Sequence, residues 1–173
     1  MRFTDVLKND MNAAYKATDG LMSMCDDSML GWKPASGANW MTVGQLLKHI
    51  TEACGWCCKA FVTGDWGMPA SGDGKPEEMT MPTAASMPSV ASVAEARKAL
   101  AADKRTAFAT IKKVGERGLS TKKAIAPWDP KHPEVLGVHF LHMTSHLSGH
   151  KAQLFYYLKL MGKPVHTGNL YGM

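Results

Sequence analysis

The sequence lacks any apolar run long enough to cross a bilayer, which takes about 20 predominantly apolar residues. It also lacks the features of a secretory signal peptide, because its first residues, MRFTDVLKND, mix acidic with apolar side chains instead of leading into an apolar stretch. These two absences predict a protein with no membrane partner and a cytoplasmic location.

Cysteine is scarce and unevenly placed. Of the four cysteines, Cys25 stands apart, while Cys54, Cys57 and Cys58 lie within five positions, which is not the spacing of a disulfide framework. Cys54 and Cys57 form a CxxC motif, but no strand pattern precedes it, as it would in a thioredoxin-type redox enzyme. We therefore interpret these residues as small, buried core thiols that the cytosol keeps reduced.

A concentrated basic patch is also missing. The net charge is +5, and the densest cluster, from Lys112 to Lys123, fits a solvated helix end and loop. No recognition-helix motif is present, so we expect no nucleic-acid partner. The hydrophobic fraction of 45% and the charged fraction of 20% are typical of a globular protein, and the length predicts a single domain over residues 1–173.

Strand patterns and internal repeats are absent, whereas helical spacing recurs along the chain. Apolar residues at intervals of three, four and seven predict helices over residues 3–24, 43–61, 92–114 and 133–161. The intervening segments 26–41, 63–91 and 119–132 read as loops, with Trp32 and Trp40 anchoring the first of them. The tail 163–173 has no periodicity, and we expect it to pack along the helices or on a partner. The sequence therefore predicts an all-α fold, a four-helix bundle.

Histidines are concentrated in the last predicted helix. His142, His146 and His150 follow each other at intervals of four and form a stripe on one helix face. The ends of this stripe lie about 12 Å apart along the helix axis, whereas metal–nitrogen bonds are about 2 Å long. Two neighbouring histidines can therefore share one metal ion, either 142 with 146 or 146 with 150, and a third ligand must come from elsewhere.

His49 is the natural third ligand, because it flanks the apolar face of the second predicted helix. Its competitors are His132 and His166, both in loops, and His139, one turn before the stripe. Three histidines around an ion with one open position are typical of catalytic rather than structural sites. Imidazole ligands suit Zn, Ni, Cu or Fe(II).

Several motifs together resemble the DinB family of small metal-binding four-helix bundles. They are WKP at 32–34, WMTVGQLLKHI at 40–50, HxxxHKAQL at 146–154, LxxxGxP at 158–164 and LYG at 170–172. The resemblance spans essentially the whole chain and implies three metal ligands at His49, His146 and His150, with Zn or Ni as the ion. It implies that His142 is a neighbour of the site and that Gln153 braces a ligand or a helix contact.

The resemblance also carries expectations about the assembly. It implies an up-down-down-up helix order with the long loop between the second and third helices, and a homodimer. Family members usually have Arg-Gly after the last histidine, whereas this chain has Lys151-Ala152, so an anion contact made by that arginine is not carried over.

The function implied by the resemblance is a metal-dependent thiol S-transferase or a related detoxification enzyme acting on a small-molecule substrate. The metal would activate the thiol of a low-molecular-weight cofactor, and the loop 63–91 would help to cover the substrate. One alternative is a metal-dependent hydrolase that activates water, with Glu52 as the candidate general base. Another is a non-enzymatic metal-binding or stress-response protein, in which Cys54 or Cys57 would close the coordination sphere.

Overall fold

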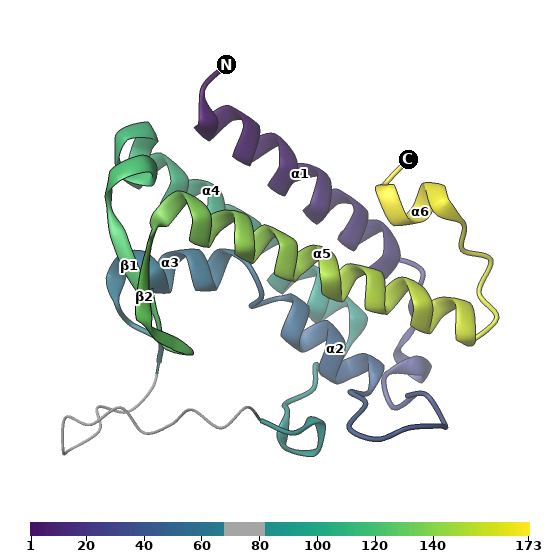
Figure 1. The fold of residues 1–173 in the computed structure, drawn as a ribbon. Coiled ribbons are helices and arrows are strands. Elements are labelled where there is room, and N and C mark those ends of the chain that lie inside the picture. The colour runs from purple at the N-terminus through teal and green to yellow at the C-terminus, as the bar shows by residue number, and fades with distance from the viewer. Residues whose placement is uncertain (68–81) are drawn as a thin grey trace.

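The computed structural model of the chain describes residues 1–67 and 82–173, and these form a mostly helical fold (Figure 1). Among the described residues, no helix combines the length and the apolar character that spanning a bilayer requires. The elements in chain order are α1 (Phe3–Met22), η1 (Asp27–Met29), α2 (Val43–Ile50), α3 (Gly55–Thr63), η2 (Ala84–Ser86), α4 (Val93–Thr121), β1 (Lys123–Ala126), β2 (Asp129–Val135), α5 (Leu136–Leu160) and α6 (Thr167–Tyr171).

Helix α5 is the centre of the helical packing and contacts α1, α2, α3 and α4 (Figure 1). Helix α4 packs on α1 and α3, and the chain end folds back so that α6 contacts α1 and α5, as expected for the tail. Burial of apolar area between these helices is the main stabilising contribution. The shared core is one cluster of buried side chains that includes Leu7, Met11, Leu46, Ile50, Ile111, Leu147, Leu154 and Leu158.

The helix predicted over residues 43–61 is broken, and this prediction is corrected. Helix α2 ends at Ile50, and α3 starts at Gly55, after a short turn. The carboxylate of Asp103 in α4 accepts hydrogen bonds from the backbone N–H of Gly55 at 2.8 Å and of Trp56 at 2.6 Å. It also accepts one from the Tyr15 hydroxyl at 2.7 Å. Asp103 thus satisfies N–H groups that the start of α3 would otherwise leave without partners.

Glycine is required at position 55 by close packing. A Cβ at this position would lie 1.9 Å from the backbone carbonyl oxygen of Asp103, well inside van der Waals contact. The absent side chain lets α3 and α4 approach closely enough for the carboxylate to reach the helix start.

The expectation of a loop over 119–132 and of no strand is also wrong. Strands β1 and β2 form an antiparallel hairpin in which Lys123 pairs with Val135 and Ala124 with Glu134. Most residues of the hairpin are exposed, so they do not alternate between apolar and polar side chains as a half-buried strand does. A ring nitrogen of His139 in α5 lies 3.0 Å from the Ala124 carbonyl oxygen and connects the hairpin to the helices.

Helix α4 continues beyond residue 114, where the sequence predicted its end. Gly115 has φ 69° and ψ 174°, which interrupts the helix, and a further helical segment follows to Thr121. Just after this kink, the Glu116 carboxylate accepts hydrogen bonds from the backbone N–H of Phe3 at 2.8 Å and of Thr4 at 2.9 Å. The kink therefore brings a carboxylate to the start of α1, where free N–H groups favour negative charge.

Candidate metal centre

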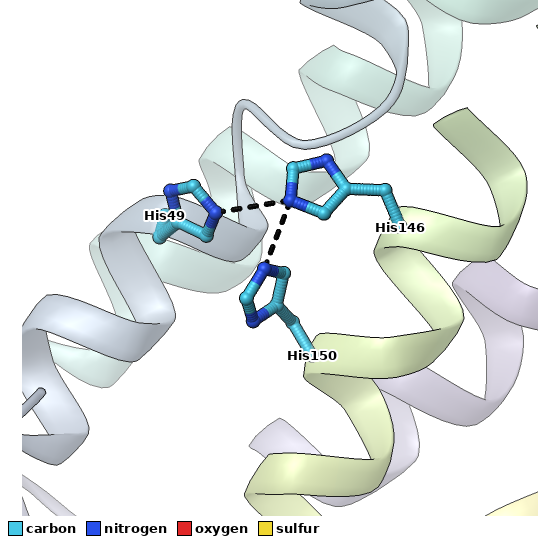
Figure 2. Close-up of side chains that lie close together, drawn as sticks. All are labelled: His49, His146 and His150. Atoms are coloured by element: carbon cyan, nitrogen blue, oxygen red, sulfur yellow. Dashed lines mark hydrogen bonds between the residues drawn. The ribbon is translucent and has the colours of Figure 1, made fainter. Parts of the chain in front are cut away.

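Three histidines from two helices converge on one point (Figure 2). His49 lies in the last turn of α2, and His146 and His150 lie one turn apart on α5. The Nε2 atom of His146 lies 3.2 Å from Nε2 of His49 and 2.9 Å from Nε2 of His150. One nitrogen from each ring lies within 4.8 Å of the other two, and the described residues contain no other group of His, Cys, Asp or Glu arranged in this way.

Helix geometry accounts for the convergence. Residues four apart lie on the same face of α5, which places the second and third rings side by side. Helix α2 is fixed at its start by a capping box, in which the Thr42 hydroxyl accepts from the Gln45 backbone N–H and the Gln45 side chain accepts from the Thr42 N–H. Leu46, Leu47 and Ile50 of α2 are fully buried, so this short helix has one orientation against the core, and His49 is directed toward α5.

The donor set fits a metal ion. Nitrogen ligands at about 2.1 Å from one ion lie about 3.0–3.4 Å apart for angles between octahedral and tetrahedral. The two observed separations, 2.9 and 3.2 Å, are close to that range. Moreover, each ring nitrogen offers one hydrogen or one lone pair in the ring plane, so Nε2 of His146 can make a directed hydrogen bond to only one of its two neighbours. An ion at the centre would use all three lone pairs at once.

The rings are held in the neutral form that a metal ligand needs. Burial, and then the neighbouring His150 and His146, lower the pKa of His49 from 6.5 to about 4. Burial lowers the pKa of His146 as well, with a further contribution from His150 and an opposing one from the Ala53 backbone. The pKa of His150 is lowered by burial, against the raising effect of its hydrogen bond to Gln153.

A chain of hydrogen bonds fixes which nitrogen of His150 is free. The Met41 carbonyl can only accept, so the Tyr157 hydroxyl donates to it at 3.0 Å and accepts from the Gln153 side-chain amide at 3.1 Å. The Gln153 side-chain oxygen therefore faces His150 and accepts from its Nδ1–H at 3.1 Å. This direction of the protons leaves Nε2 of His150 with its lone pair toward the other two rings.

One protein family model matches most of the chain. The family model described as the DinB superfamily matches residues 11–154, which include all three histidines. The chain belongs to the DinB superfamily. This confirms the resemblance inferred from the sequence motifs. No curated protein and no solved structure gives a significant match.

Within this DinB fold, the remaining histidines lie elsewhere. His142 is exposed and lies one turn before His146 on α5, and the grouped histidines are 146 and 150 rather than 142 and 146. His139 stacks on the Phe61 ring at a centroid distance of 3.9 Å and is buried. His132 contacts Asp129 in the hairpin, and the His166 side chain accepts from the Gly168 N–H at the start of α6.

The cysteines that could have closed the site belong to the core. Cys54 and Cys58 are fully buried, and all four cysteines are free thiols. Burial first, and then the nearby Asp103, raise the pKa of Cys57 to about 12, so this thiol stays protonated. Its Sγ lies 3.4 Å from the Glu52 carbonyl oxygen. None of these residues joins the histidine group, so among the described residues the group offers three candidate ligands.

Sequence reasoning missed two residues that shape the centre. Tyr157 is 2% exposed and contacts the rings of Trp32 and Trp40 edge-on at centroid distances of 5.3 and 6.2 Å. The two tryptophans thus anchor the 26–41 segment on α5, as expected, and they also hold the hydroxyl that orients Gln153. Gln45, which closes the capping box of α2, is the second residue missed. It lies four residues before His49 and so on the same helix face, which could have indicated that it lies near the site.

Proposed function

We propose that the protein binds one divalent metal ion through His49, His146 and His150. With this ion bound, it would act as a metal-dependent thiol S-transferase. The observation that carries this proposal is the composition of the site. Its three ligands are neutral imidazoles, and no carboxylate or thiolate of the described residues joins them. A divalent ion held by neutral ligands keeps its full positive charge, which favours an anionic fourth ligand such as a thiolate.

A bound divalent ion supplies the charge that deprotonates a coordinated thiol, and the thiolate is the reactive nucleophile. The protein's own residues would hold the geometry: Gln153 and Tyr157 orient His150, and the partial burial of the three rings limits access of water. In the transfer step, a bond forms between sulfur and an electrophilic carbon of the small-molecule substrate. The bond to a leaving group such as halide breaks, the leaving group takes the electron pair, and the thiol proton goes to solvent.

The finer features of the assembly belong to the same proposal. We propose a four-helix bundle in up-down-down-up order that forms a single domain. Its four segments would be α1, then α2 together with α3, then α4, and then α5. Tyr156 and Leu160 on α5 are large exposed apolar residues, 60% and 67% exposed, which supports a homodimer. The loop expected to cover the substrate spans residues 63–91, and its part from 68 to 81 lies outside the described residues.

Metal content tests the first half of the proposal. We expect protein purified without a histidine tag, and dialysed against Zn²⁺ or Ni²⁺, to retain about one ion per chain, as a three-histidine site predicts. His49→Ala and His146→Ala should each lose this ion. His142→Ala is the matched control, because this exposed histidine lies one turn from His146 on the same helix and should leave binding unchanged. Wild-type protein that stays folded and binds neither ion would refute the site.

Thiol transfer tests the second half. Metal-loaded protein would be mixed with a halogenated dinitrobenzene and, in turn, with L-cysteine, glutathione or 2-mercaptoethanol, and thioether formation would be followed by absorbance. The proposal requires a rate above the uncatalysed reaction that disappears in His146→Ala and persists in His142→Ala. Full metal occupancy without any acceleration across a panel of thiols and electrophiles would identify a metal-binding protein that lacks this activity.

A further inference from the structure

A small cleft borders the metal centre on the side of α2. Its volume is about 190 Å³, and Lys48, His49 and Glu52 line one wall, while residues of the 82–88 segment, including Ser86 and Met87, line the other. Pockets for drug-sized ligands usually start at about 300 Å³. This cleft therefore suits a compact molecule, or the compact end of a larger one.

The far wall of the cleft is attached to α2 by hydrogen bonds. The Gln45 side-chain amide donates to the carbonyl oxygens of Ala84 at 2.7 Å and Met87 at 2.9 Å. The Ala84 N–H donates to the Asn39 side chain at 2.8 Å, and the Val90 N–H donates to the Gly44 carbonyl at 3.2 Å. The wall is thus held in place before any ligand arrives, which lowers the entropic cost of binding.

The near wall presents one positive and one negative side chain beside His49. Lys48 and Glu52 are four residues apart and form an ion pair, with side-chain exposures of 33% and 50%. Ion pairs at such exposed positions contribute little to stability, so each member can exchange its partner for a ligand group. A ligand with a single charge would leave one of the two side chains without its partner, whereas a ligand with both charges would satisfy both.

We propose that this cleft binds a small zwitterionic thiol, with its carboxylate on Lys48, its ammonium group on Glu52 and its sulfur at the three-histidine centre. This inference rests on the proposed function, because the sulfur needs the metal, and it adds the substrate class and two recognition residues. Binding forms a metal–sulfur contact and releases the thiol proton to solvent.

Co²⁺-loaded protein provides the test, since a thiolate bound to Co²⁺ gives a sulfur-to-metal absorption band. Three probes would be titrated: L-cysteine with both charges, 3-mercaptopropionate without the ammonium group, and cysteamine without the carboxylate. We expect Lys48→Gln to weaken L-cysteine and 3-mercaptopropionate about fivefold, the upper end for a partly exposed ion pair, and not to weaken cysteamine, whose ammonium group no longer competes with Lys48 for Glu52. Glu52→Gln should weaken L-cysteine and cysteamine by a similar factor and should not weaken 3-mercaptopropionate.

Comparing each variant with wild type on the same probe cancels the intrinsic affinity of each thiol for Co²⁺. Lys59→Gln is the control for a lost positive charge, because Lys59 is exposed on α3 and does not line the cleft; all three affinities should stay at wild-type values. Metal analysis after each titration confirms that the thiol has not removed the ion. Equal effects of a variant on all three probes, or no effect on any, would overturn this inference alone. Wild-type protein that takes up no Co²⁺ would refute the proposed function as well.

Discussion

Replacing Tyr157 by Phe tests the hydrogen-bond chain behind His150. The change removes one hydroxyl and leaves the ring contacts with Trp32 and Trp40 in place. The Gln153 amide loses the acceptor 3.1 Å away that defines its orientation, so its oxygen is no longer fixed toward Nδ1 of His150. Loss of such an outer partner lowers metal affinity about 10- to 100-fold. Because Tyr157 acts through Gln153, we expect the lower end, about tenfold or about 1.4 kcal/mol.

The assay is competition for Zn²⁺ against a chromophoric chelator, combined with ¹⁵N NMR of the imidazole nitrogens in the metal-free protein. Wild type should show His150 protonated at Nδ1, whereas Tyr157→Phe should show a mixture of both tautomers. Gln153→Leu should weaken binding more strongly, because it removes the direct partner of His150. Tyr156→Phe is the matched control, since that neighbouring ring is 60% exposed and the hydroxyl bonded to Gln153 and Met41 is that of Tyr157. Wild-type affinity together with an unchanged tautomer in Tyr157→Phe would refute the reasoning.

Three further predictions concern stability and can be measured by urea unfolding of the metal-free protein. Asp103→Ala leaves the Tyr15 hydroxyl and the Trp56 N–H without their acceptor and the Gly55 N–H with only the Tyr15 hydroxyl, and should lower the free energy of unfolding by about 3–5 kcal/mol; a loss below about 1 kcal/mol would contradict this. The pKa of His49 is lowered from 6.5 to about 4, so between these pH values the unfolded chain binds a proton at His49 and the folded chain does not. The free energy of unfolding should therefore fall as the pH drops through this window, by about 1–2 kcal/mol once solvent screening is allowed for, and a flat profile would count against the buried neutral ring. Gly55→Ala should destabilise by about 3 kcal/mol because its Cβ would meet a carbonyl oxygen at 1.9 Å, whereas Gly20→Ala, with nothing within 4 Å in α1, should stabilise by about 0.5–1 kcal/mol; similar effects at the two positions would contradict the packing argument.

The sequence was informative wherever the deciding interactions are local. Helical spacing predicted α1, α4 and α5, and the interval of four placed His146 and His150 together. The Thr42 cap before α2 and Gly162 just after α5, where its φ is 75°, are local signals of the same kind. These features depend on residues within one or two helical turns, so periodicity and capping preferences are sufficient to predict them.

The features that were missed depend on partners far along the chain. The break between α2 and α3 is stabilised by Asp103, 48 residues after Gly55, and the Tyr157 hydroxyl finds its acceptor at Met41, 116 residues away. The hairpin was missed because its two prolines, Pro130 and Pro133, and its exposed side chains resemble a loop. Choosing the 146/150 pair needed the family resemblance, because spacing alone also allowed 142 with 146.

The origin of the three histidines in two separate helices has a consequence for the whole chain. His49 and His146 are 97 residues apart, and all four cysteines are free thiols. An ion bound by both would close a loop of that length, as a disulfide does, and loop closure of about 100 residues lowers the entropy of an unfolded chain enough to stabilise the fold by about 4–5 kcal/mol. The ion would thus act as a removable cross-link. Withdrawing it with a chelator should let the amide hydrogens of α2 exchange faster than those of α1, which the cross-link does not include.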